Sequence, residues 1–404
     1  MVARLLHRAH QITVYEAAEH IGGHVHTVRV DTADATHHVD TGFIVYNERN
    51  YPAFSRLLSR LGVATQESTM SFSVHADRGG FEYSSSLPLG LFARPSLALR
   101  PTFQLMFADY ARYRRAAQRL LLGGAADDST TIADFVRAGR YSASFVERML
   151  VPLGASIWSA DRSRFLRFPA RYVIEFFNNH GLLSRRERPQ WRAISGGSAR
   201  YVDALVQPFR DRIRLTAPVV SVSRDATGVD VRVRGGEPER FDRVVIAAHG
   251  DQALAMLGDA TPRERTLLSA FPYQANAAVL HTDSRLLPRS RRAWASWNFH
   301  LADDPGQPVG VTYHMNRLQR LDADRQFCVT LNRDDDVDAA AVVRRVPYEH
   351  PLYTSSTVRA QAEHESLNGL NHTYYCGAYW GYGFHEDGVQ SGLRVAARFG
   401  ETLR

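Results

Sequence analysis

The chain has 404 residues, of which 44% are hydrophobic and 23% are charged. At roughly 100–200 residues per domain this length predicts two or three domains, and the composition excludes a disordered or fibrous chain. The two cysteines, Cys328 and Cys376, are too few for a disulfide framework, a structural zinc set or a cysteine-ligated cluster. A reducing compartment is the simplest interpretation, and we expect a cytoplasmic protein.

All 49 basic residues are arginine, and the formal net charge is +7. The lack of lysine excludes Schiff-base and pyridoxal-phosphate chemistry as well as a P-loop. Because the arginines are spread along the chain, we interpret them as a solvated surface, with an anionic membrane surface as the alternative, and we expect no nucleic-acid partner. No window supplies about 18 uninterrupted apolar residues, so no membrane-spanning helix is predicted.

The first predicted strand covers residues 11–15, where apolar and β-branched residues alternate with polar ones. It ends in Glu16, at the place where a dinucleotide-binding sheet puts the carboxylate that accepts hydrogen bonds from ribose hydroxyls. Residues 2–8 before it have the apolar spacing of the end of a helix. Taken alone, a strand that ends in an acid is weak support for a cofactor site.

Periodicity and turn residues predict the elements that follow. After Gly22 and Gly23 we expect a hairpin over 25–30 and 36–39, the segment Asp40-Thr41-Gly42-Phe43, a helix over 52–61 and a short hairpin over 72–75 and 81–84. Further helices are predicted near 101–122, 131–138, 142–151 and 198–209, and further strands over 213–216, 219–224, 229–234, 241–248 and 372–377. A helix over about 388–399 ends the series.

The order of these features resembles the flavin-containing amine oxidase and phytoene desaturase superfamily, whose members bind FAD. Residues 376–392, Cys-Gly-Ala-Tyr-Trp-Gly-Tyr-Gly-Phe-His-Glu-Asp-Gly-Val-Gln-Ser-Gly, are similar to a bacterial branch often encoded beside cyclopropane-fatty-acid-synthase-like methyltransferases. The resemblance implies an α/β fold. It predicts a discontinuous Rossmann-like FAD-binding domain over 1–61, 190–250 and 370–404, with an inserted mixed α/β substrate domain over 62–189 and 251–369.

The resemblance also implies which residues hold FAD at its adenosine end. Glu16 would bind the ribose, and Val219 would contact the adenine through its backbone. Gly22 and Gly23 would let the backbone approach the pyrophosphate without a Cβ in the way. His24 stands where the family usually has arginine, and a neutral histidine offers one donor and no fixed charge.

At the flavin end, Thr41, Gly42 and Phe43 would pass beside the isoalloxazine ring. Gly388 and Val389 would open the last helix, and their N–H groups together with the helix dipole would favour negative charge on the reduced flavin. Gly377 and Asp387 complete the residues that the resemblance assigns to the cofactor.

Three features depart from the family pattern. The glycine-rich Rossmann turn and its strand are not in the printed sequence, which opens inside the helix that should follow them, so we expect weak FAD binding by the chain as given. The acid usual after the strand glycine is replaced by Ala378, for which Glu386 or Asp387 could substitute. The lack of lysine removes the residue that holds a water beside the flavin in many amine oxidases.

We therefore expect an FAD-dependent dehydrogenase or desaturase that takes a hydride from an apolar acyl or lipid-like substrate. A flavin amine oxidase and a flavin-free, non-catalytic remnant are the alternatives. His385 is the best acid/base candidate, with a structural hydrogen bond as an equal alternative.

Two further segments carry weaker signals. The apolar residues 87–107 are interpreted as a wall of the substrate domain, with a patch peripheral to the inner membrane as the alternative. His24, His26, His37 and His38 could gather around a metal, but histidines near a glycine turn are more often solvated or hydrogen-bonded, and we expect no metal.

Overall fold

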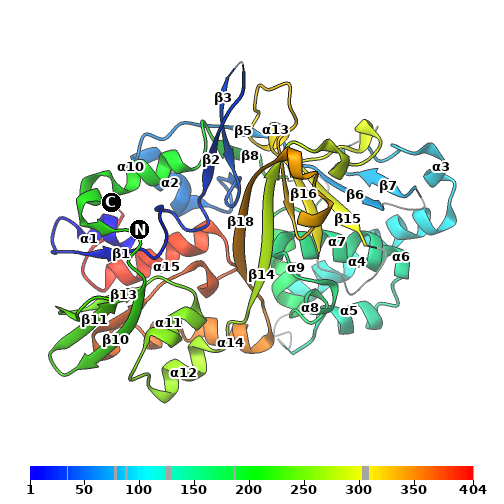
Figure 1. The fold of residues 1–404 in the computed structure, drawn as a ribbon. Helices are drawn as coiled ribbons and strands as arrows, with labels where there is room; N and C mark the ends of the chain where they lie inside the picture. The colour runs from blue at the N-terminus through cyan, green and yellow to red at the C-terminus, as the bar shows by residue number, and fades with distance from the viewer. Residues whose placement is uncertain are drawn as a thin grey trace.

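The structure is a computed structural model that describes residues 1–33, 35–76, 80–86, 90–123, 129–184, 188–302 and 309–403. The chain has a mixed α/β fold. One half is built on the largest sheet and a group of helices, and the other half combines small sheets and helices and contains both chain ends (Figure 1).

Within the described ranges the largest sheet has seven strands. In spatial order they are β18 (Val342–Pro351), β14 (Tyr273–His281), β17 (Cys328–Leu331), β16 (Gly310–His314), β15 (Trp297–Leu301), β6 (Phe72–Ala76) and β7 (Glu82–Ser84). Neighbours are antiparallel except β15 and β6, which run parallel with Trp297 opposite Phe72. The predicted hairpin at 72–84 is confirmed as β6 and β7, and the parallel pair joins it to strands far along the sequence.

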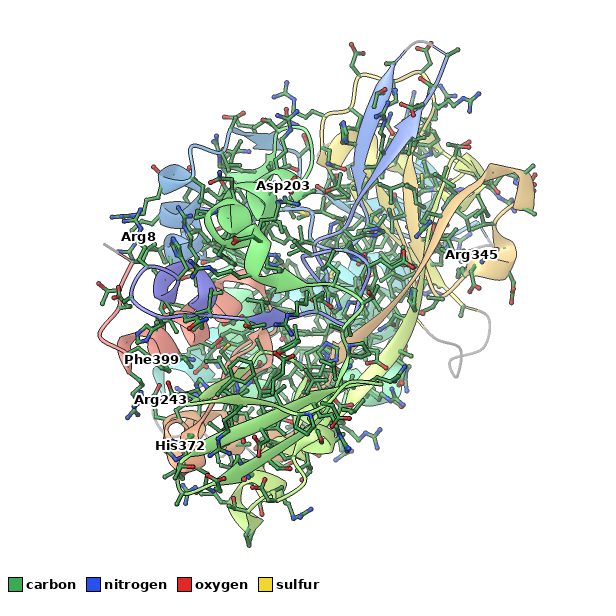
Figure 2. All side chains as sticks on the ribbon, turned by 60° about the vertical axis from the view of Figure 1, so that its left-hand side comes forward. Arg8, Asp203, Arg243, Arg345, His372 and Phe399 are labelled. Carbon is green, nitrogen blue, oxygen red and sulfur yellow. The ribbon has the colours of Figure 1, made fainter. Side chains whose placement is uncertain are left out.

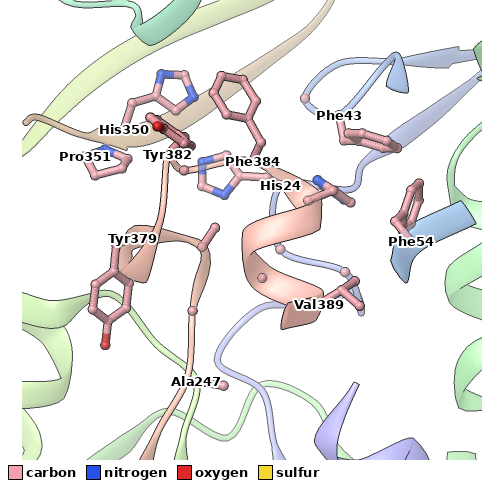
Figure 3. Close-up of a pocket in the computed structure, with 18 of the residues that line it drawn as sticks. His24, Phe43, Phe54, Ala247, His350, Pro351, Tyr379, Tyr382, Phe384 and Val389 are labelled. Carbon is pink, nitrogen blue, oxygen red and sulfur yellow. The ribbon is translucent and has the colours of Figure 1, made fainter. Parts of the chain in front are cut away.

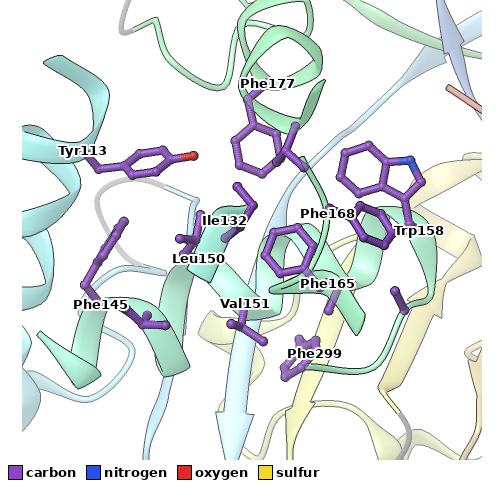
Figure 4. Close-up of a cluster of buried hydrophobic side chains, with 14 of the residues drawn as sticks. Tyr113, Ile132, Phe145, Leu150, Val151, Trp158, Phe165, Phe168, Phe177 and Phe299 are labelled. Carbon is purple, nitrogen blue, oxygen red and sulfur yellow. The ribbon is translucent and has the colours of Figure 1, made fainter. Parts of the chain in front are cut away.

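Helices from the middle of the chain pack beside this sheet and form the largest hydrophobic cluster (Figures 1 and 4). They are α3 (Pro95–Ala98), α4 (Pro101–Leu122), α5 (Ile132–Ala138), α6 (Ala143–Phe145), α7 (Val151–Trp158), α8 (Arg162–Phe165) and α9 (Ala170–Asn179). Phe165, Phe168 and Phe177 are almost completely buried in the cluster, and Phe299 of β15 reaches it from the sheet.

The predicted helix over 142–151 is instead α6, a π-helical turn (Val146–Leu150) and the start of α7. Pro152 explains the irregularity, because it has no N–H to donate to the carbonyl of Arg148 four residues earlier. The hydroxyl of Tyr83 donates to that carbonyl instead, over 2.8 Å. The break in the helix therefore becomes a contact between the helices and the sheet.

The other half contains two parallel strand pairs: β1 (Val14–Tyr15) with β9 (Ile213–Arg214), and β13 (Val244–Ile246) with β19 (Thr373–Tyr375). Its remaining strands are β10 (Val219–Asp225), β11 (Gly228–Val233) and β12 (Glu239–Phe241) in one sheet, β4 (Tyr46–Asn47), β8 (Trp191–Ile194) and β5 (Thr65–Ser68) in another, and the hairpin β2 (Thr27–Asp31) and β3 (Thr36–Asp40). The strand predicted over 241–248 is thus divided between β12 and β13.

The remaining helices are α1 (Val2–Leu6), α2 (Pro52–Arg60), α10 (Ala199–Val206), α11 (Gly250–Met256), α12 (Pro262–Leu268), α13 (Met315–Leu318), α14 (Ser355–Ala362) and α15 (His385–Ala397). A buried ion pair joins three elements: Arg224 of β10 donates to both carboxylate oxygens of Glu264 in α12, and the hydroxyl of Tyr375 in β19 donates to the same carboxylate. Although burial opposes ionisation, these bonds lower the pKa of Glu264 to about 2.

Arginines lie at both ends of the molecule, with Arg8 and Arg243 at one end and Arg345 at the other (Figure 2). Arg345 of β18 pairs with Asp334 at 3.3 Å, whereas the guanidinium of Arg243 lies 5.3 Å from the ring centre of Phe399. Among the described residues, no helix combines the length and the apolar character needed to cross a membrane.

Candidate cofactor and substrate site

A large cavity of about 3080 Å³ extends between the two halves. Ligand pockets commonly have about 300–1,000 Å³, so this cavity has room for a large cofactor and a substrate together. Its walls contain all but one of the residues predicted to bind cofactor or act in catalysis: Glu16, Gly22, Gly23, His24, Thr41, Gly42, Phe43, Val219, Gly377, His385, Gly388 and Val389. The exception is Asp387, which is not part of the wall.

At one end of the cavity Glu16 follows β1 directly. The parallel pairing continues past the strand, since the Glu16 N–H donates to the Arg214 carbonyl and the Ala217 N–H donates to the Glu16 carbonyl, both over 2.9 Å. One carboxylate oxygen accepts the Ala18 N–H at 2.9 Å. The backbone thus holds the acid beside Val219, the first residue of β10, which lines the same cavity.

Gly42 is required by close backbone packing. The Phe43 N–H donates to the His24 carbonyl over 3.0 Å, and a Cβ at residue 42 would lie 2.0 Å from that carbonyl oxygen. Thr41 is buried beside it, with its hydroxyl 2.8 Å from the Tyr348 hydroxyl. The segments around His24 and Thr41 therefore form one rigid wall of the cavity.

Helix α15 begins at His385, three residues before the predicted start at Gly388. The Asp387 carboxylate accepts the Phe384 N–H over 2.9 Å, which caps the helix at the earlier position. The Gly388 N–H donates to the Phe384 carbonyl at 3.1 Å, so this N–H is already used within the helix, and the contact of Gly388 and Val389 with the flavin stays a prediction. A Cβ at Gly388 would find nothing closer than the Ala378 Cβ at 3.8 Å, so α15 presents bare backbone to the cavity.

The two acids after His385 serve the backbone, and neither takes the place of the acid missing at Ala378. Glu386 accepts the N–H groups of Ala53 and Phe54 at the start of α2. Asp387 faces its own helix start, and burial raises the pKa of its carboxyl group to about 6. The idea that Glu386 or Asp387 substitutes for a cofactor-binding acid is therefore not supported by their contacts.

His385 is held on two sides. Its ring stacks on Phe43 with the centroids 3.6 Å apart, and its Nε2 lies 2.9 Å from the hydroxyl of Tyr201 in α10. Burial and the neighbouring His24 lower the pKa of the imidazole to about 3. A neutral imidazole with so low a pKa is a weak base at pH 7, and its catalytic role stays a prediction.

Sequence reasoning missed a group of imidazoles that meets His24. The ring of His24 lies 5.4 Å from that of His350 and 6.0 Å from that of His249, and it stacks on Tyr348. Burial is the main cause that lowers the pKa of His24 to about 4 and that of His350 to about 3. His249 and His350 carry no motif: the pairing of β14 with β18 places His350 here, and His249 arrives from the start of α11.

Aromatic side chains form the cavity wall next to these imidazoles (Figure 3). Phe384 stacks on Phe176 with centroids 5.1 Å apart, and Phe176 lies 4.9 Å from Trp158. The indole N–H of Trp158 donates to the Tyr382 carbonyl over 3.2 Å. This bond ties α7 of the helical half to the glycine- and aromatic-rich loop before α15, so both halves contribute to one apolar wall.

Comparison with known proteins identifies the class to which this fold and site belong. The model of the flavin-containing amine oxidoreductase family matches residues 1–308. The chain belongs to this family, which implies a flavin cofactor. A comparison with curated proteins finds no match.

Three solved structures share the fold: putrescine oxidase bound to putrescine (TM-score 0.69, 15% identity), cyclohexylamine oxidase from Brevibacterium oxydans IH-35A (0.68, 16%) and a CLA-producing fatty acid isomerase from P. acnes (0.66, 15%). Each match covers 98% of this chain and 95% of the other. The predicted superfamily and α/β fold class are confirmed, while the domain boundaries and the individual cofactor contacts stay predictions.

Proposed function

We propose that the protein is an FAD-dependent dehydrogenase or desaturase that acts on an apolar acyl or lipid-like substrate. The observation that carries this proposal is the wall of the cavity, where aromatic side chains adjoin imidazoles of low pKa. Such a wall excludes water and favours a hydrocarbon chain. A fatty acid isomerase is among the proteins with this fold, and this supports the proposal.

The residues present fit FAD at three places. Glu16 can accept hydrogen bonds from ribose hydroxyls, Val219 offers backbone at the same end, and the bare backbone at Gly388 leaves room for a flat ring against α15. When bound, FAD accepts the hydride that the substrate loses. The protein's part is to hold the acyl chain against Phe176 and Phe384 and to keep water out.

Amine oxidation is the second candidate, and family membership favours it. Putrescine oxidase and cyclohexylamine oxidase share the fold. The chain offers no lysine to hold a water near the flavin, and the imidazoles beside the aromatic wall are neutral at pH 7. For these reasons we propose acyl oxidation before amine oxidation.

Anaerobic reduction of the bound flavin tests both candidates. The purified protein is loaded with FAD, and loss of the visible flavin absorbance is followed after addition of unsaturated or methyl-branched acyl lipids, primary amines or polyamines. Bleaching by acyl lipids supports the proposal, and bleaching by amines alone overturns it in favour of amine oxidation. Failure to bind any FAD supports the flavin-free alternative.

The segment 87–107 connects the cavity with the surface, although its residues 87–89 lie outside the described part of the chain. Leu91 and Phe107 line the cavity, whereas Phe92, Leu99 and Leu105 are exposed. We propose that these exposed side chains touch a lipid surface from which the substrate enters. Sedimentation of the protein with anionic vesicles, and its loss in a Phe92→Ser, Leu99→Ser variant, would support that contact.

A further inference from the structure

His350, near the end of β18, accepts or donates the last hydrogen bond in a network of side-chain amides. Its Nδ1 lies 3.1 Å from the amide nitrogen of Asn276 on the neighbouring strand β14. Which of the two atoms donates depends on how the Asn276 amide is turned. Two independent anchors determine that orientation.

The first anchor is the backbone of β14. The Ala277 N–H can only donate, and it bonds the Oδ1 of Asn332 at 3.0 Å. The other end of the Asn332 amide, Nδ2, therefore donates, to the Val309 carbonyl at 3.2 Å and to the Oδ1 of Asn276 at 2.8 Å. Asn276 must turn its oxygen toward Asn332.

The second anchor comes from the helical half. The Arg164 guanidinium has only donors, and it bonds the Oε1 of Gln274 at 2.7 Å. The Nε2 of Gln274 therefore donates, to the Ser159 carbonyl at 2.8 Å and to the Oδ1 of Asn276 at 3.2 Å. Both anchors thus agree on the orientation of the Asn276 amide.

The tautomer of His350 follows from this orientation. One N–H of the Asn276 amide donates to the Gln274 carbonyl at 3.0 Å, and the other donates to the Nδ1 of His350. Because Nδ1 accepts, the ring proton of the neutral imidazole is on Nε2. The low pKa of His350 keeps the ring in this form at pH 7.

The Nε2–H of His350 is available to a ligand. Within the part of the chain that the structure describes, no hydrogen bond to this atom is formed, and His350 lines the cavity together with Pro351, Tyr382 and Phe384 (Figure 3). A ligand in the cavity that supplies an acceptor can therefore form a hydrogen bond with this N–H.

We propose that the Nε2–H of His350 binds the acyl oxygen of the substrate, a carboxylate or carbonyl, and thereby selects acyl compounds over amines. An ammonium group has only donors, so it cannot accept a hydrogen bond from this N–H, and the two donor groups would repel each other. The inference rests on the proposed function, and it names the group that the site recognises. One backbone N–H and one arginine side chain thus determine, through three amides, that the ring proton of His350 is on Nε2.

Equilibrium binding of decanoate and decylamine tests this role without any turnover. Titration calorimetry with the FAD-loaded protein compares the natural chain with His350→Phe, which keeps a ring and loses the donor, and with His350→Gln, which keeps an N–H near the same place. We expect His350→Phe to weaken decanoate binding about 10–100-fold and to change decylamine binding less than about threefold. His350→Gln should retain decanoate binding within about threefold.

Equal weakening of both ligands in His350→Phe, or unchanged decanoate binding, would overturn the assignment. So would a loss of FAD affinity in His350→Phe with decanoate binding intact, because the acceptor would then belong to the cofactor. If decanoate binding depends on His350 but no acyl lipid bleaches the flavin, recognition stands and the proposed reaction fails. If acyl lipids bleach the flavin equally in wild type and His350→Phe, the reaction stands and the recognition role fails.

Discussion

The half of the molecule that contains the large sheet and helices α3 to α9 packs around the largest cluster of buried side chains, and two smaller clusters lie against the strands at the other end of the sheet. The half that contains β1, β13 and α15 is divided into smaller clusters around the cavity. Its parallel strands occur in two separate pairs, and residues of both β1 and β13 line the cavity. Two-stranded pairs contribute little stability alone.

From this difference we infer that the two halves have different sources of stability. The first half should resist unfolding through its own packing, while the second should gain stability from whatever fills the cavity, because a ligand that binds only the folded state stabilises it. Unfolding measured with and without FAD separates these contributions. The variants below are ordered by the size of the effect we expect.

Removal of a core ring from the first half should have the largest effect. Phe165 is fully buried, with ring centroids 5.9 Å from Phe168 and 6.5 Å from Trp158. Phe165→Ala leaves a cavity and should lower the free energy of unfolding by about 3–5 kcal/mol. Urea unfolding should show the same loss with and without FAD. If FAD restored the lost free energy of unfolding, the stability of the first half would also depend on the ligand, and the two halves would not have different sources of stability.

Glu16→Ala tests the second half through its ligand. Loss of charge-assisted hydrogen bonds worth about 1.5–3 kcal/mol should weaken FAD binding by one to two orders of magnitude. The strand should persist, since its bonds to Arg214 and Ala217 use backbone atoms. Glu19→Ala, an exposed acid outside the cavity wall, is the matched control. FAD titration that finds equal affinity in the two variants would remove Glu16 from the site.

Gly154→Ala tests packing in the first half by adding a methyl group to the core, whereas Phe165→Ala removes a ring. Alanine is favoured over glycine in a helix by about 1 kcal/mol, but a Cβ at this position in α7 would lie 2.0 Å from the Cζ of Phe165. Overpacking of about 1–3 kcal/mol should outweigh the helix propensity. We expect a lower melting temperature, again independent of FAD. An unchanged melting temperature would show that Phe165 can move aside.

Local patterns in the sequence predicted much of both halves, but not the contacts between them. The hairpin of β2 and β3 and the helices α2 and α4 follow from periodicity and turn residues near in sequence. The pairing of β15 with β6 does not, because its strands lie more than 200 residues apart and neither specifies the other. The start of α15 was misplaced because Gly388 looked like a helix boundary, whereas the cap is the side chain of Asp387.

In the candidate site, too, local sequence patterns predicted some residues and missed others. Glu16, Gly42 and Phe43 were found because they stand in segments with a recognisable order. His350 was missed, although it faces the same cavity, because a single histidine in a strand has no distinguishing neighbours in sequence. Its significance comes from the Asn276 amide, and the orientation of that amide is known only from its hydrogen bonds.

Acid should destabilise the first half through a histidine that the cavity does not touch. His281 is fully buried in β14, its Nε2 is 2.7 Å from the Thr330 hydroxyl, and burial lowers its pKa to about 4. The unfolded chain binds a proton near pH 6.5 and the folded chain does not. Stability is therefore complete above pH 6.5 and is lost as the pH falls toward 4, by about 1.4 kcal/mol per pH unit.

His281→Gln should remove this contribution to the slope, because glutamine does not titrate. Unfolding free energies at several pH values between 4 and 7 measure it for both proteins. FAD should leave the slope difference unchanged, since His281 lies in the sheet outside the cavity wall. Identical slopes in the two proteins would mean that His281 has the same pKa in the folded and the unfolded chain.

Gly388→Ala should have the smallest effect and, without FAD, the opposite sign from Gly154→Ala. Its Cβ would make ordinary contact with Ala378 at 3.8 Å, so the helix gains about 0.5–1 kcal/mol with no clash. With FAD present the gain should vanish, because the new methyl group projects from bare backbone into the space proposed for the flavin. Thermal unfolding of the variant, with and without FAD, measures both signs. A gain that persists at saturating FAD would place the flavin away from α15. The opposite effects of Gly388→Ala and Gly154→Ala on stability would then come only from local packing, and not from a dependence of the second half on FAD.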